Sequence, residues 1–235
     1  TTTANFTAYN TEVTALPFEN VVFMDSFQGV VSQVKVGDAA GSLYGYTWTE
    51  VDGQRLIGSN GLPVLKKTDK GDFEYSKVAN AFPDWVATIN NTFNYKNFNL
   101  SFLFEYKEGG SAFDSGQRNG LRNGVLKITE ERNITKVLDG VRSNGAGGYV
   151  KNDIAAIIDA NSYYRNENYN RASEILVQDA SWLKLRNVSL SYNLPSELLR
   201  KLNIATASFT VSGSNFLLWT PFRGFDPEGS QFSSG

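Results

Sequence analysis

Apolar and polar side chains alternate with a period of two along residues 86–107, and this pattern constrains the fold more than any other feature. Two runs, 86–95 and 98–107, each keep the alternation, and they meet at Lys96-Asn97. In the second run the apolar series is Phe98, Leu100, Phe102, Phe104 and Tyr106. Successive side chains of a β-strand point to opposite faces, so a period of two indicates a strand. The segment therefore predicts a β-hairpin with a two-residue turn.

Three more segments show the same period. They are residues 4–9, 182–193 and 205–218. Between the last two, Pro195 precedes residues 196–202, which predict a short helical turn because proline suits the start of a helix. The chain is therefore predicted to be all-β, with about five antiparallel strands.

The links between these strands differ greatly in length. Residues 96–97 and 194–203 are short connections, whereas 11–84 and 108–175 are long and rich in Gly, Asn, Asp and Tyr. Compact soluble domains seldom carry structureless loops beyond about 12 to 15 residues. Outer-membrane barrels have short turns on the periplasmic side and long loops outside. The spacing favours a segment of a large transmembrane β-barrel with long extracellular loops.

A half-buried antiparallel sheet in a sandwich shows the same alternation. The alternative interpretation is a secreted β-sandwich that serves as a carbohydrate-binding or adhesion module, with its aromatic faces turned into one core. Aromatic residues toward the strand ends favour the barrel, because such rings form interfacial girdles there. These residues are Tyr95, Phe98, Tyr106, Tyr192 and Trp219.

Composition excludes several classes of function. The 235 residues include no His and no Cys, so a Ser-His-Asp or Cys-His nucleophile, a His or Cys zinc site and a disulfide framework are all excluded. A net charge of -2 without basic clusters argues against nucleic-acid binding. No run approaches the roughly 18 to 20 apolar residues of a transmembrane helix. Catalysis, if any, would rest on carboxylate, Lys, Tyr or hydroxyl groups, and carboxylate neighbours such as Glu130-Glu131 are more often solvated loop charges than acid/base pairs. We therefore expect no enzyme activity, no cofactor and no metal site.

Aromatic residues in the long segments are the best candidates for binding. Trp48, Tyr163, Tyr164 and Tyr169 have Asn and Arg residues around them, and flat rings beside amides suit sugars or peptide side chains. The alternative is that these rings pack the loops against each other. The Gly145-Ala146-Gly147-Gly148 stretch predicts a loop tip rather than a phosphate-binding loop.

Residues 177–195 read VQDASWLKLRNVSLSYNLP and resemble the "dgSFlRLrNvtLgYtLP" stretch of SusC/RagA-type TonB-dependent outer-membrane transporters. Other matches to this family follow in the same order along nearly the whole chain. They include Val36-Gly37-Asp38 with Tyr44-Gly45-Tyr46, the 81–98 hairpin, the 211–216 segment with Asn215-Phe216, and Gly224-Phe225-Asp226-Pro227-Glu228.

The resemblance implies that residues 1–235 form the C-terminal part of a barrel of about 22 strands, within the range of such barrels. The plug, the TonB box and the closing strand would lie outside them. It further implies a bacterial outer-membrane location and TonB-dependent import of oligosaccharides or oligopeptides. The expected partners are a SusD-like surface lipoprotein, outer-membrane lipid, and TonB acting through the N-terminal plug. A second alternative is a SusC-like subunit recruited to another outer-membrane complex.

The alternation also assigns the two faces of the predicted wall. The expected lipid-facing residues are Phe98, Leu100, Phe102, Phe104, Val188, Leu190, Phe209 and Val211. The expected lumen-facing residues are Asn99, Ser101, Asn187, Ser189, Thr210 and Ser212.

Overall fold

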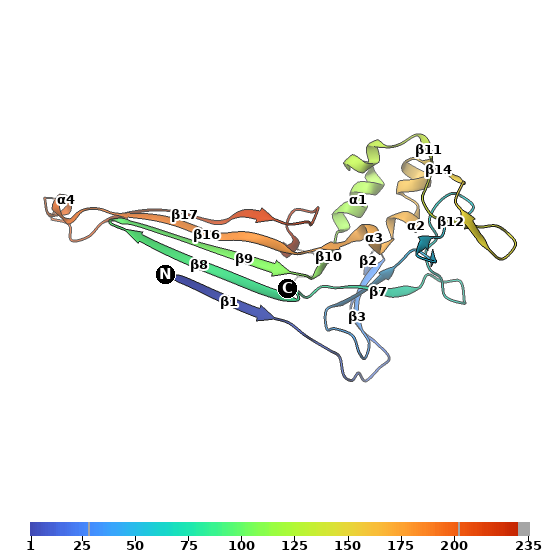
Figure 1. The fold of residues 1–235 in the computed structure, drawn as a ribbon, viewed down its shortest axis with the longest axis horizontal. Coiled ribbons are helices and arrows are strands. Elements are labelled where there is room, and N and C mark those ends of the chain that lie inside the picture. The colour runs from blue at the N-terminus through green and yellow to red at the C-terminus, as the bar shows by residue number, and fades with distance from the viewer. Residues whose placement is uncertain (28, 202, 230–235) are drawn as a thin grey trace. The chain divides into compact units, whose positions relative to one another are not determined.

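The computed structural model describes residues 1–27, 29–201 and 203–229. Strands hold 47% of the residues and helices 15%, which confirms an all-β chain. The chain divides into two compact units (Figure 1). The first, here the sheet unit, comprises Thr1–Asn10, Phe82–Gly110 and Asp179–Arg223. The second, here the loop unit, comprises Thr11–Ala81, Ser111–Gln178 and the residues from Gly224 onward.

The sheet unit is one five-stranded antiparallel sheet whose strands follow one another in chain order. This confirms the predicted strands, although the strand expected over 205–218 begins three residues later. The strands are β1 (Thr2–Ala8), β8 (Trp85–Tyr95), β9 (Phe98–Glu108), β16 (Trp182–Asn193) and β17 (Ser208–Trp219).

Both short connections of the sheet lie at the same end of its strands. Lys96 and Asn97 join β8 to β9, and Lys96 has a left-handed φ of 51°, as a tight hairpin turn requires. The other connection contains α4 (Ser196–Arg200), which follows Pro195 as predicted. The expected helical turn extended to residue 202, which lies outside the described residues. At the opposite end the chain leaves the sheet for the long segments.

A register shift in β16 between Leu185 and Asn187 was not predicted from the alternation. Leu185 lies opposite Phe104, whereas Val188 lies opposite Phe102, so β16 holds one extra residue at Arg186. A β-bulge adds one residue to one strand of a pair. Two residues on either side of the bulge that are an odd number of positions apart can therefore point to the same face. Leu185 therefore shares a face with Val188, although strict alternation would put them on opposite faces.

The long segments are folded, which differs from the predicted loops. They form a four-stranded sheet of β2 (Val21–Phe27), β3 (Val30–Val34), β4 (Ser42–Tyr46) and β7 (Tyr75–Asn80). Four two-stranded ladders accompany it: β5 (Glu50–Val51) with β6 (Gln54–Arg55), β10 (Ser111–Phe113) with β15 (Val177–Asp179), β11 (Ile134–Val137) with β14 (Ala155–Ile158), and β12 (Val141–Ser143) with β13 (Tyr149–Lys151). The tip expected at residues 145–148 lies in the β12–β13 turn.

Short helical elements complete the loop unit. They are α1 (Ser115–Asn123), η1 (Lys127–Glu130), η2 (Ala160–Tyr164), α2 (Glu167–Asn170), α3 (Ser173–Leu176) and η3 (Pro227–Gly229). The longest, α1, is capped by Asp114, whose carboxylate accepts a hydrogen bond from Gln117 N at 2.8 Å, and it ends at Gly124 with φ 69°. Among the described residues, no helix has the length and apolar content needed to cross a membrane.

Two clusters of buried side chains hold the loop unit together. The larger contains Trp48, Leu62, Leu65, Leu121, Ala156, Ile158, Tyr164, Tyr169 and Ala172. The smaller contains Val30, Leu43, Phe113 and Leu176. Their members come from segments more than one hundred residues apart, so each cluster forms only when both long segments fold together.

Candidate functional site

The five-stranded sheet has one apolar face whose side chains are exposed or partly exposed to solvent. Phe93 is 55% exposed, Phe209 67% and Val211 58%. All eight residues predicted to face lipid lie on this face, because Phe104, Phe102 and Leu100 pair with Leu185, Val188 and Leu190. A sandwich would bury such a face against a second sheet. This exposure therefore argues against the sandwich alternative.

Aromatic rings pair across neighbouring strands on this apolar face. Phe98 lies 4.7 Å from Tyr192 between ring centroids, and Phe93 lies 5.9 Å from Phe102. At the other end of the strands, Trp85 lies 5.1 Å from Tyr106. Cross-strand aromatic pairs of this geometry contribute about 0.5–1.5 kcal/mol each beyond the area they bury. Rings therefore stand near both ends of the strands, as predicted for interfacial girdles.

The opposite face is polar, and its side chains bond one another. The Ser191 and Thr210 hydroxyls lie 2.9 Å apart, and Ser214 Oγ donates to Asn187 Oδ1 at 3.1 Å. The six predicted lumen-facing residues share this face, since Ser189 pairs with Ser101 on one side and with Ser212 on the other. Because these groups satisfy one another and remain hydratable, the face suits contact with water rather than with hydrocarbon.

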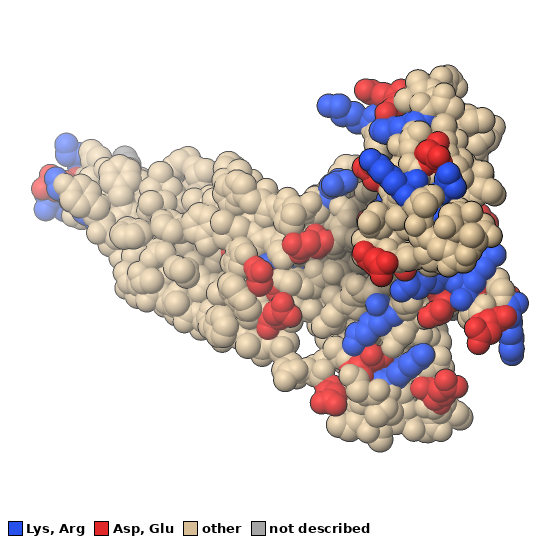
Figure 2. Space-filling view, turned by 45° about the vertical axis from the view of Figure 1, so that its right-hand side comes forward, with Lys and Arg blue, Asp and Glu red and all other residues tan. Residues whose placement is uncertain are grey.

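Charged residues are absent from the middle of the sheet. The strands β8 and β17 contain none, and β9 has none before Glu105. Figure 2 shows the same distribution on the face in view, with the strands uncharged between their two ends. An uncharged band between charged ends is the pattern of a strand wall that crosses a bilayer.

The charged end of the polar face is organised around Trp182. Trp182 is 6% exposed, and its ring centroid lies 4.2 Å from Lys107 Nζ and 4.7 Å from Lys184 Nζ. Arg186, at the bulge, donates from Nη2 to Glu105 Oε1 at 2.6 Å, with both side chains mostly shielded from water. The extra residue of β16 thus brings a guanidinium to the polar face and pairs it with β9.

The structure brings the four predicted binding aromatics together in the core of the loop unit. The Tyr163 and Tyr169 ring centroids lie 4.1 Å apart, and Trp48 lies 6.4 Å from Tyr169. Trp48, Tyr164 and Tyr169 are each less than a tenth exposed, and Tyr163 packs against them from a partly buried position. This geometry supports the alternative interpretation, in which these rings pack the loops against each other. Ligand contact by these residues stays a prediction.

Polar groups fix the orientation of these rings. Trp48 Nε1 donates to the Asn168 carbonyl at 2.7 Å, and the Arg55 guanidinium lies 3.8 Å from the indole centroid. The Tyr164 hydroxyl lies within hydrogen-bond distance of two backbone carbonyls. Burial raises the pKa of Tyr163, Tyr164 and Tyr169 above that of free tyrosine. The three phenols are therefore neutral at physiological pH.

Two of the family-like motifs meet in space around Asp38. Its Oδ2 accepts from the Tyr44 hydroxyl and from Lys35 N, both at 2.7 Å, and Lys77 Nζ lies 3.0 Å from Oδ1. Burial by itself would raise the pKa of Asp38, but these hydrogen bonds outweigh it and lower the pKa. Burial and the bond to Asp38 raise the pKa of Tyr44 to about 12.

Close packing explains the glycine in the Tyr44-Gly45-Tyr46 motif. A Cβ built on Gly45 would lie 2.0 Å from Ser173 Oγ and 3.3 Å from the Gly29 carbonyl oxygen. A Cβ at this position would force the Ser173 hydroxyl to turn away and would still be tightly packed, so glycine lets β4 lie close to the start of α3. The motif therefore serves the packing of the loop unit.

A hollow of ≈ 500 Å³ lies between the β5–β6 and β12–β13 hairpins of the loop unit, and sequence reasoning missed it. It is lined by Val51, Asp52, Gln54, Asp139, Gly140, Val141, Tyr149, Val150 and Lys151. These residues are far apart in sequence and form no motif, so no local signal could have revealed them together. Among the described residues, no group of three or more His, Cys, Asp or Glu could hold a metal ion.

No family model matches the chain. Over 254 aligned residues the chain is 26% identical to a TonB-dependent receptor of Formosa agariphila, and the match covers 97% of this chain and 23% of that receptor. A second TonB-dependent receptor of the same organism is 29% identical over 163 residues, covering 66% of this chain.

The fold of this chain is similar to parts of solved structures. The RagAB peptide transporter matches with a TM-score of 0.60 and 20% identity, and the RagAB peptide importer in its open-open state matches with a TM-score of 0.60 and 18% identity. Each match covers 97% of this chain and 24% of the solved one, so the chain spans about a quarter of the length of these relatives. The predicted resemblance is thereby confirmed, and the chain is similar over nearly its whole length to a segment of SusC/RagA-type TonB-dependent receptors.

Proposed function

We propose that this chain is a C-terminal part of the barrel wall and outer loops of a TonB-dependent importer in the bacterial outer membrane. The observation that carries the proposal is the two-faced sheet, which is aromatic and exposed on one side and polar and hydrogen-bonded on the other. A barrel strand needs this combination because hydrocarbon lies outside it and water inside. The likeness to TonB-dependent receptors supports the same function.

Strand length agrees with a membrane crossing. Each of β8 and β9 has 11 residues, and β16 and β17 have 12. A rise of about 3.4 Å per residue, with a tilt of about 35–45°, lets about 9 to 11 residues cross a hydrocarbon band roughly 25 Å tall. The uncharged stretches of β8 and β17 are long enough for this band.

The sheet has two edges, β1 and β17, that have no neighbouring strand among the described residues. In lipid each unpaired backbone group costs several kcal/mol, so an open sheet is unstable there. We infer that further strands of a longer protein pair with both edges and close the barrel. The chain's share of its relatives, about a quarter, leaves room for these strands, a plug and a TonB-contacting segment.

The cargo and partners follow from the same resemblance. We propose uptake of oligosaccharides or oligopeptides, driven by TonB through the plug, with a SusD-like lipoprotein over the outer loops. The solved relatives are described as peptide transporters or importers. The loop unit, which connects to the end of the strands opposite the short turns, is the part of this chain that would face the lipoprotein and the cargo.

A subunit recruited to another outer-membrane complex would have the same wall but no uptake. The test is a chromosomal deletion of the full-length gene, with growth and uptake of labelled oligosaccharides or oligopeptides measured with and without TonB. Fractionation and heat-modifiable gel mobility report the barrel itself. Loss of uptake when either this gene or TonB is removed supports the importer. An outer-membrane protein without any uptake defect would favour the recruited subunit, and a soluble protein would refute both.

A further inference from the structure

We infer that the hollow between the β5–β6 and β12–β13 hairpins binds a short segment of a neutral oligosaccharide. The inference rests on the proposed function, since it names the class of cargo that the loop unit contacts. A volume of ≈ 500 Å³ lies within the range of about 300–1,000 Å³ that small-ligand sites occupy. The two hairpins are held rigidly, and the residues that line the hollow carry groups that recognise sugars.

The β5–β6 hairpin places a carboxylate at the rim of the hollow. Asp52 and Gly53 have φ values of 51° and 74°, and they form the two-residue turn that joins β5 to β6. Two central residues with positive φ are typical of the tight turn that suits a short hairpin. Asp52 and Gln54 thus lie on a stiff connection rather than on a long loop.

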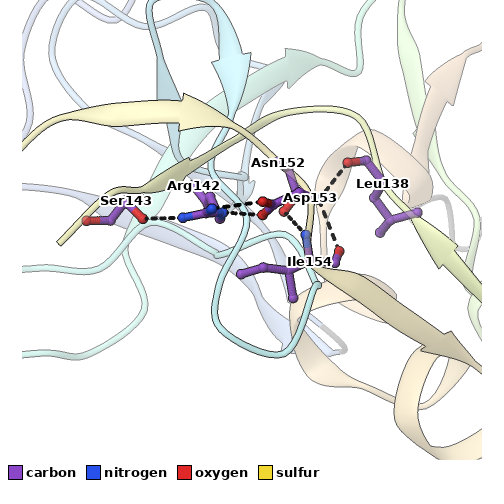
Figure 3. A network of polar contacts seen from close by, with 6 residues as sticks. All are labelled: Leu138, Arg142, Ser143, Asn152, Asp153 and Ile154. Atoms are coloured by element: carbon purple, nitrogen blue, oxygen red, sulfur yellow. Dashed lines mark hydrogen bonds and ion pairs between the residues drawn. The ribbon is translucent and has the colours of Figure 1, made fainter.

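The β12–β13 hairpin is held at its base by a polar network (Figure 3). Arg142 binds both carboxylate oxygens of Asp153, with Nη2 at 2.9 Å from Oδ2. Asn152 is 4% exposed, and its side chain donates to the Leu138 carbonyl at 2.8 Å and accepts from Ile154 N at 3.0 Å. A bidentate guanidinium and a fully bonded buried amide fix the hairpin before any ligand arrives.

The two hairpins are joined directly to each other. Ile57 N, just after β6, donates to the Val141 carbonyl at 2.8 Å. Gly140 has φ 147°, and a Cβ there would lie 2.2 Å from the Arg55 carbonyl oxygen, so only glycine allows this approach. The walls of the hollow therefore keep a fixed spacing, which reduces the ordering cost of binding.

The lining combines groups that recognise sugars. Asp52, Asp139 and Gln54 offer carboxylate and amide oxygens, which accept hydrogen bonds from hydroxyl groups. Tyr149 is 50% exposed and offers a ring against which the C–H face of a sugar can pack, and Lys151 adds a donor. Two carboxylates against one ammonium disfavour an anionic ligand, since like charges repel. Each hydroxyl of a neutral sugar can donate to these oxygens and accept from the Lys151 ammonium, so such a ligand satisfies the lining without bringing a charge to it.

The test uses the purified full-length protein in detergent, with any lipoprotein that co-purifies. The probes are short neutral oligosaccharides of glucose, galactose, mannose or xylose, together with an acidic oligosaccharide and a mixed tripeptide pool. We expect a neutral oligosaccharide to bind, with at least tenfold weaker affinity for Tyr149→Ala and for Asp139→Asn. The matched control is Asp69→Asn, which changes an exposed carboxylate of the same unit on a turn away from the hollow and should leave affinity unchanged.

Three outcomes would overturn the inference: no binding of any neutral oligosaccharide, binding that neither variant weakens, or peptide or acidic-sugar binding that depends on Tyr149 and Asp139. Measuring the outer-membrane location and TonB-dependent uptake of the wild type and both variants distinguishes failure of this binding site from failure of the proposed function. If the wild-type protein still assembles and imports a cargo, only the site is rejected. Correct gel mobility of both variants shows that the barrel has assembled, and unchanged protease resistance of the loop unit excludes its misfolding as the cause of weaker binding.

Discussion

An arginine in place of Phe102 tests the assignment of the two faces most sharply. Phe102 is near the middle of β9, lies opposite Asn91 and Val188, and contacts the rings of Phe93 and Phe104 at 5.9 and 5.7 Å. The matched control is Ser101→Arg at the neighbouring position. It introduces the same charge on the polar face.

The expected cost follows from depth and contacts. An arginine on the lipid face near the midplane costs about 2–4 kcal/mol. Loss of two aromatic contacts adds about 0.5–1.5 kcal/mol for each. The cost of placing arginine on the lipid face alone corresponds to roughly a 30- to 1,000-fold change in the ratio of folded to unfolded barrel. Ser101→Arg should cost little, because Ser101 lies between Thr92 and Ser189 on the hydratable face.

The assay compares both variants in the full-length protein. Heat-modifiable gel mobility in outer-membrane fractions gives the assembled share, and denaturant unfolding in lipid vesicles gives the difference in free energy. We expect Phe102→Arg to lower both strongly and Ser101→Arg to resemble wild type. Equal assembly of the two variants, or a greater loss for Ser101→Arg, would refute the assignment of the faces.

Three other substitutions test the loop unit in the same full-length protein. Gly45→Ala should destabilise it by about 1–3 kcal/mol through overpacking against Ser173, and the double variant with Ser173→Ala should recover part of the loss; a larger loss in the double variant would contradict the steric explanation. Tyr44→Phe removes a hydrogen bond that lowers the pKa of Asp38. The stabilisation from this lowered pKa is present above the unfolded-state pKa of about 3.9 and disappears as pH falls through the folded-state pKa, so the difference in unfolding free energy between wild type and variant should shrink in acid; a difference independent of pH would contradict this role. Tyr164→Phe should cost about 0.5–1.5 kcal/mol, measured by unfolding, because the phenol proton no longer bonds to either of two partly buried backbone carbonyls; an unchanged unfolding midpoint would contradict this contribution.

The bulge at Arg186 illustrates a signal that the sequence contains but that alternation alone does not resolve. Leu183 and Leu185 have odd numbers, whereas Val188, Leu190 and Tyr192 have even ones, so the apolar series changes parity within one strand. Such a change can mean a bulge or the end of the strand. The pairing with β9 on one side and β17 on the other decides that it is a bulge.

The loop aromatics show a different limit. Composition and position identified Trp48, Tyr163, Tyr164 and Tyr169 as a group, and the structure brings them into mutual contact. Their burial depends on neighbours such as Leu65 and Leu121, which lie elsewhere in the chain. Burial is a property of the assembled core, so no local pattern could separate a packing role from an exposed binding role.

The sequence by itself determined the five strands, their turns and the chemistry of their two faces, because side-chain alternation and turn preference act between near neighbours along one strand. Only the tertiary structure decided that the long segments fold into a unit with its own core, and that Asp52 and Asp139 line one hollow. These features arise from contacts between distant segments. Their stability comes from apolar surface that the segments bury against each other. Neither segment alone shows an apolar periodicity that would predict this burial.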